Sequence, residues 1–163
     1  MFRALLQTRP EFSLFLLRIA LGITLLPHGL AKLGIFVDGA PPLQESIDKT
    51  VQIFERNFGL GPVWAYLATA AEILAPIALI VGLLGRFAAL AVVGTMGVAA
   101  WKTMELKAGG TALIDLPHVK WWWMDMVGQT SYGSYHILAI AVGIAILIRG
   151  SGWLSLDRAF TKP

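Results

Sequence analysis

Four long apolar segments divide the chain, and each has about the length needed to cross a bilayer. They cover residues 12–33, 62–84, 87–104 and 132–148. A membrane-spanning helix needs roughly 20 mostly apolar residues, with a range of about 17–25. Gly82 and Gly85 leave a tight turn between the second and third segments, whereas the other connections are longer. The pattern predicts an all-α fold, an integral membrane four-helix bundle in a single domain over residues 1–163.

A fifth segment, residues 45–58, has a different pattern. Ile47, Val51, Phe54 and Phe58 recur at helical spacing, and charged residues lie between them. An apolar stripe on an otherwise charged helix is typical of a helix that lies in the membrane interface. We therefore expect an amphipathic helix on the membrane surface between the first two spans.

The composition agrees with a membrane protein. Hydrophobic residues make up 56% of the chain and charged residues 14%, whereas a soluble domain usually carries about 25% charged residues. The formal charge is only +3, and no basic run is interleaved with stacking aromatics. The expected partner is therefore the lipid bilayer and not a nucleic acid. The chain has no cysteine, which excludes disulfides and thiolate-held metals or clusters, and we expect no metal site.

Four spans place both termini on one side of the membrane. Seven basic residues fall on that side and six on the other, so the raw count decides little. The tight turn, however, carries Arg86 as its only charge. Short cytoplasmic loops are enriched in Lys and Arg. We expect both termini in the cytoplasm.

Two spans carry ionisable residues, which are costly in lipid and usually face the bundle interior. Arg18, His28 and Lys32 share one face of the first span at about 100° per residue. Glu72 lies near the middle of the second span. An isolated carboxylate there would be protonated or paired. We predict an intramembrane ion pair between Arg18 and Glu72. The pair either takes part in the protein's function or fixes the register of the two helices.

Two prolines lie beside these residues. Pro27 cannot donate to the Ile23 carbonyl, and Pro76 cannot donate to the Glu72 carbonyl. In lipid each freed carbonyl needs another partner, which polar side chains, water or a ligand could supply. The sequence around residues 25–34 therefore indicates a kinked, polar-lined part of the bundle interior.

Several polar and aromatic residues are expected at one depth, toward the outer face. They are His28, Lys32, Trp101 and His136. An imidazole and a lysine could hydrogen-bond the carbonyls of a quinone, or two histidines could ligate a haem b axially. A histidine that is only hydrogen-bonded inside the bundle is the structural alternative. We expect a quinone at this layer, with haem b as the lesser candidate.

The long connection at 105–131 contains three consecutive tryptophans. The simplest interpretation is that these tryptophans belong to an aromatic belt at the level of the lipid headgroups. A lining for a flat ring ligand is the sharper alternative. A third is a surface for docking a protein partner, formed by Trp121, Trp122, Trp123 and Asp125.

Three stretches together resemble the DoxX family of small four-helix membrane proteins. They are LLRIALGITLLPHGLAKLG in the first span, AEILAPIALIVGLLGR in the second, and GSGWLSLD at residues 150–157. The resemblance implies a protein of the cytoplasmic membrane of bacteria or archaea. The family's namesake is the small subunit of a thiosulfate:quinone oxidoreductase. By position, Arg18, His28, Lys32 and Glu72 match the family pattern.

Three functions remain open from the sequence. The first is a subunit of a redox system, with quinone-associated electron transfer to or from a partner protein. The second is a non-catalytic anchor or assembly subunit of a larger membrane complex. The third is a pathway for protons or a small solute through Arg18 and Glu72. Whether the chain is itself an enzyme stays open.

Overall fold

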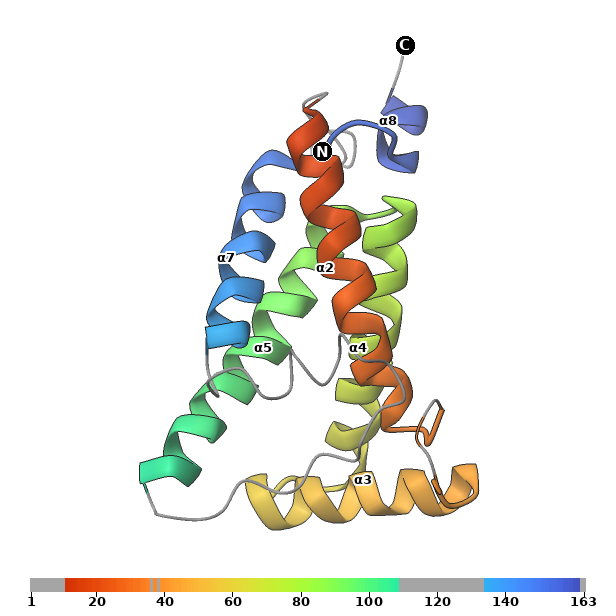
Figure 1. Cartoon of the computed structure of the whole chain (residues 1–163), viewed down its shortest axis with the longest axis vertical. Helices are drawn as coiled ribbons and strands as arrows, with labels where there is room; N and C mark the ends of the chain where they lie inside the picture. The colour runs from red at the N-terminus through yellow and green to blue at the C-terminus, as the bar shows by residue number, and fades with distance from the viewer. Residues whose placement is uncertain (1–10, 36, 38, 109–133, 162–163) are drawn as a thin grey trace.

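The chain folds into helices that run mostly side by side (Figure 1). The structure, a computed structural model, describes residues 11–35, 37, 39–108 and 134–161. Within these ranges every regular element is an α-helix, so the predicted all-α class is confirmed. The helices are α2 (Phe12–Ala31), α3 (Leu43–Phe58), α4 (Pro62–Val81), α5 (Gly85–Ala108), α7 (Ser134–Arg149) and α8 (Leu156–Thr161).

The four long helices form a closed ring of contacts. α2 packs against α4 and α7, and α5 packs against the same two helices. Leucines of α2 and α4 meet small residues of α5 and α7 in the core, which includes Leu21, Leu79, Ala89 and Ala139. Small residues let helices approach closely, so this ring brings polar side chains of different helices within reach of one another.

The register between α2 and α4 is fixed by two glycines. A Cβ on Gly22 would lie 3.0 Å from the Pro76 carbonyl oxygen, and one on Gly29 would lie 2.6 Å from that of Glu72. The residue numbers rise along α2 while they fall along α4, so the two helices are antiparallel. This register decides which side chains of the two helices can meet.

Four predicted spans and the amphipathic segment all occur as helices, with shifted ends. α4 ends at Val81 because Gly82 adopts a left-handed conformation (φ 74°) and its N–H bonds to the Ala78 carbonyl. α5 begins two residues earlier and continues four residues further than the predicted 87–104. Helix α8 was not predicted, since its six residues are too short to show a period.

Helix α3 lies across one end of the long helices, while α8 and the start of α2 lie at the other end (Figure 1). Its packing contacts are with α4. The Thr50 hydroxyl donates to the Lys32 carbonyl at 3.2 Å, which ties α3 to the end of α2. The predicted amphipathic helix is therefore present and sits where the first span ends.

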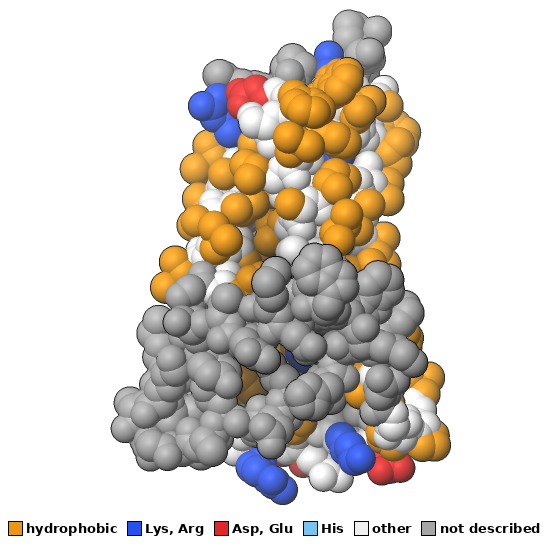
Figure 2. Space-filling model, in the orientation of Figure 1, with side chains coloured by type: hydrophobic (Ala, Val, Ile, Leu, Met, Phe, Trp, Pro, Cys, Tyr) orange, Lys and Arg blue, Asp and Glu red, His pale blue; other side chains and the backbone are white. Residues whose placement is uncertain are grey.

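Apolar side chains dominate the outer surface of the long helices. On the face seen in Figure 2 they cover the upper part of the bundle, and charged side chains gather at its two ends. Leu67, Leu74 and Leu138 are each more than half exposed. Among the described residues, α2 and α4 are long and apolar enough to cross a bilayer, and α7 is apolar but shorter. Only 33% of the apolar window of α2 and 22% of that of α4 is buried, unlike core helices of a soluble protein.

Candidate functional site: a polar cluster at the α3 end of the helices

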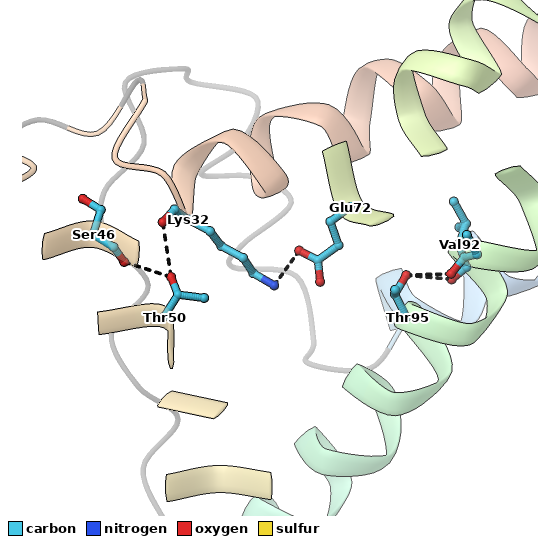
Figure 3. Close-up of polar contacts among 7 residues, drawn as sticks. Lys32, Ser46, Thr50, Glu72, Val92 and Thr95 are labelled. Carbon is cyan, nitrogen blue, oxygen red and sulfur yellow. Dashed lines mark hydrogen bonds and ion pairs between the residues drawn. The ribbon is translucent and has the colours of Figure 1, made fainter. Parts of the chain in front are cut away.

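An ion pair joins α2 and α4 where α3 crosses them. Lys32 Nζ lies 2.5 Å from Glu72 Oε2, and both side chains are mostly shielded, with 29% and 14% exposed (Figure 3). Lys32 is the residue that ends α2, so its long side chain can extend back along the helix toward α4. Its ammonium also lies 5.6 Å from the centre of the Phe54 ring of α3, a cation–π distance. Lys32 therefore connects α2, α3 and α4.

The predicted ion pair between Arg18 and Glu72 is wrong. The Arg18 guanidinium lies against Gly82, ten residues along α4 from Glu72, or about 15 Å at 1.5 Å per residue. The prediction paired the two residues only by their expected depth in the membrane. The antiparallel register instead brings Glu72 level with Gly29 and Lys32, so Lys32 is its partner.

Arg18 belongs to a second group of polar residues at the opposite end, the C-terminal latch (Arg18, Ser151, Leu154 and Asp157). Arg18 is fully buried and donates to the carbonyls of Ser151 at 2.7 Å and Leu154 at 2.9 Å. These bonds hold the segment after α7 against α2. The stretch GSGWLSLD therefore has a structural role in this chain.

Asp157 completes the latch. It is 2% exposed and accepts hydrogen bonds from the N–H groups of Leu84 and Gly85 and from the Ser151 hydroxyl. A carboxylate at this position satisfies the free N–H groups at the start of α5 and complements the helix dipole. The C-terminal segment thus caps a helix that begins 72 residues earlier in the chain.

Two histidines and a tyrosine extend the site at the α3 end. The His28 ring stacks on the Tyr135 ring with centroids 5.6 Å apart and planes at 16°. His136 follows, with its ring 5.9 Å from that of Tyr135. His28 and Glu72 line the same small cavity, which links these rings to the ion pair. We call His28, Lys32, Glu72, Tyr135 and His136 the polar cluster.

Hydrogen bonding orients His28 and leaves other atoms of the cluster unpaired. His28 Nδ1–H donates to the Thr24 carbonyl at 3.0 Å, so Nε2 is the acceptor in a neutral ring. Across the described residues, His136 Nδ1 is buried and has no hydrogen-bond partner, and the Tyr135 hydroxyl is buried beside the Thr24 side chain without a well-formed hydrogen bond. Buried polar atoms usually have a partner, so these two indicate a ligand or water.

A cavity of about 10 Å³ lies beside His28 and Glu72, with Thr95 and Met96 on its far side. That volume holds about one water molecule. Pro76 also lines it, and this proline leaves the Glu72 carbonyl without its helical donor. The predicted polar-lined interior is present here, with room for a water and none for a ring-sized ligand.

The remaining predicted site residues lie elsewhere. Trp101 is 66% exposed on α5 and does not line the cavity beside His28. Trp121, Trp122, Trp123 and Asp125 fall outside the described residues. Sequence reasoning missed Tyr135 and Asp157. The sequence offered two signals for them. Tyr135 is a tyrosine next to His136, and Asp157 is an acid inside an otherwise apolar C-terminal stretch.

The fold is a small helical one in which α2 and α4 are long and apolar enough to cross a bilayer. The family model of DoxX matches residues 13–104, which include Arg18, His28, Lys32 and Glu72. The chain belongs to the DoxX family. Comparisons with curated proteins and with solved structures give no match.

Proposed function

We propose that this chain is a multi-pass subunit of a quinone-linked redox system in a prokaryotic cytoplasmic membrane. The polar cluster carries the proposal. It gathers one cation, one carboxylate, two imidazoles and a phenol at one end of a largely apolar helix bundle. Ionisable groups at membrane depth are costly and usually mark a functional site.

The geometry of the helices supports the membrane topology. Helix α2 has 20 residues, about 30 Å at 1.5 Å per residue, which equals a typical hydrocarbon core. Helices α2, α4, α5 and α7 serve as the four spans. The end with the C-terminal latch faces the cytoplasm, and α3 lies in the outer interface.

The donors of the cluster fit a quinone. A quinone presents two carbonyl oxygens, which accept hydrogen bonds, on a flat apolar ring. The Lys32 ammonium can donate to such an oxygen. When bound, the quinone supplies two-electron redox chemistry. The residues of this chain bind it, orient it and keep bulk water away.

Haem b fits less well. Axial ligation by His28 and His136 needs space for a macrocycle between the rings. The Tyr135 ring instead stacks on His28, and the adjoining cavity holds about one water. The cavity excludes a quinone ring as well, but a quinone needs no histidine ligand and can bind through Lys32 outside the cavity, so the chain favours quinone over haem b.

A non-catalytic anchor subunit is the second candidate, and the C-terminal latch favours it. Arg18, the most deeply buried charge among the described residues, holds the segment after α7 against α2. That role also removes the main support for a solute or proton pathway through Arg18 and Glu72. An anchor needs a partner protein but no bound quinone.

The test is gentle purification of the protein from native membranes, followed by mass spectrometry of bound lipids and proteins and an absorption spectrum. The quinone function predicts a stoichiometric quinone that is depleted in Lys32→Met and retained in Arg56→Met, a control on α3. A quinone-free protein that carries only non-redox partners would establish the anchor function instead.

A further inference from the structure

A groove of about 240 Å³ lies between α3 and α4, next to the end of α2. Ile47 and Val51 of α3 form one wall, and Ala70 and Ile73 of α4 form the other. Lys32 stands at its edge. We call this the α3–α4 groove. It is more than twenty times larger than the cavity beside His28, which shares no lining residue with it.

The ion pair separates the two spaces. Lys32 lines the groove, Glu72 lines the small cavity, and the two are bonded at 2.5 Å. An ammonium carries three N–H donors, so the bond to Glu72 leaves Lys32 donors for an occupant of the groove. Glu72 thereby orients Lys32 from behind, as a positioning residue.

The lining of the groove restricts the chemistry of its occupant. Lys32 is its one charged side chain, and the rest of the wall is apolar apart from Thr50, Tyr66 and Thr69. A cation would be repelled by the ammonium, and a hydrophilic anion would lose its hydration against this wall. A neutral, flat ring with a carbonyl acceptor satisfies both conditions.

The position of the groove favours a ligand that arrives through lipid. It is partly open, and Leu67 and Leu74 of α4 expose apolar side chains beside it. Pockets for drug-sized ligands measure about 300–1,000 Å³, so the groove suits a ring while a long tail remains outside. An isoprenoid tail could lie along α4.

We infer that the α3–α4 groove holds the ring of a lipid-soluble quinone, with a ring carbonyl accepting a hydrogen bond from Lys32 Nζ. This inference rests on the proposed function. It moves the ring away from the layer of His28, Trp101 and His136 that the sequence indicated. Thr50, which ties α3 to the Lys32 carbonyl, keeps the wall of the groove beside the donor.

The test uses the full chain in lipid nanodiscs and a benzoquinone with a decyl tail as the binding probe. Ala70→Leu fills the groove from an exposed position of α4. Ala141→Leu makes the same change at an exposed position of α7 away from the groove and is the matched control. We expect at least tenfold weaker binding in Ala70→Leu and unchanged binding in Ala141→Leu. A photoreactive azido form of the probe should label α3 or α4.

The outcomes separate the two proposals. If the wild-type protein does not bind the probe, the proposed function fails and the groove assignment with it. If the wild type binds and Ala70→Leu binds equally well, or labelling falls on α7, only the groove assignment is overturned. Loss of a co-purifying phospholipid from Ala70→Leu, with probe affinity unchanged, would identify a lipid site instead. Thermal unfolding checks that both variants are folded.

Discussion

Lys32 at the end of α2 and Glu72 in the middle of α4 form an ion pair of 2.5 Å across the helix interface. The pair depends on Gly29, because the lack of a side chain there lets α2 approach the Glu72 backbone. The close helix contact and the ion pair therefore occur at the same point of the α2–α4 interface. This point also borders the cavity beside His28 and the α3–α4 groove.

Removing one member of this pair should destabilise the protein. Glu72→Met leaves the Lys32 ammonium without its carboxylate in apolar surroundings. We expect a loss of about 2 kcal/mol, less than the roughly 3–5 kcal/mol for a fully buried pair, because both side chains keep some exposure. Thermal unfolding in detergent measures it. The double variant Lys32→Met/Glu72→Met should recover most of the loss, and strictly additive effects would contradict the pairing.

The elements of this fold were predictable from sequence, and their register was not. Apolar runs of span length identify α2 and α4, and the stripe from Ile47 to Phe58 identifies α3, because periodicity is a local property. The partner of Glu72 depends on how far α2 slides along α4. Contacts at Gly22 and Gly29 set that distance. The sequence alone does not distinguish these two contact glycines from glycines that end or interrupt a helix.

The candidate site was predictable in part, for the same reason. His28 and Lys32 share a helix face, so their proximity follows from helix geometry. Tyr135 joins them only through the packing of α7 against α2. Arg18 shares the same face of α2, yet its bonds to Ser151 and Leu154 span more than 130 residues of sequence. No local pattern distinguishes such a structural arginine from a functional one.

Gly29→Ala should destabilise the contact between α2 and α4. The new Cβ would lie 2.6 Å from the Glu72 carbonyl oxygen and 2.9 Å from its carbon. Backbone cannot move aside as a side chain can, so we expect a loss of about 1–3 kcal/mol, as for other overpacked contacts. The matched control is Gly94→Ala, where nothing lies within 4 Å of the new Cβ. Equal melting temperatures for the two variants would contradict the close approach.

Asp157→Asn tests the C-terminal latch. The carboxylate accepts from Leu84 N–H at 2.6 Å, Gly85 N–H at 2.9 Å and Ser151 Oγ–H at 2.6 Å. An amide keeps one oxygen and turns an NH₂ group toward these donors, so we expect a loss of about 2–3 kcal/mol. Asp48→Asn, at an exposed position of α3, is the control. Full stability in Asp157→Asn would show that α5 starts without this cap.

Tyr135→Phe separates stacking from hydrogen bonding in the polar cluster. The hydroxyl is buried beside the Thr24 side chain and makes no well-formed hydrogen bond among the described residues, so its removal should change stability by less than about 1 kcal/mol. Tyr135→Ala should instead lose about 2 kcal/mol or more, because the ring stacked on His28 is gone. Thermal unfolding compares the two variants. If Tyr135→Phe alone proves strongly destabilising, the hydroxyl has a structural partner and is not held available for a ligand. If stability holds while binding of the decyl benzoquinone weakens severalfold, the ring lies at the polar cluster and not in the α3–α4 groove.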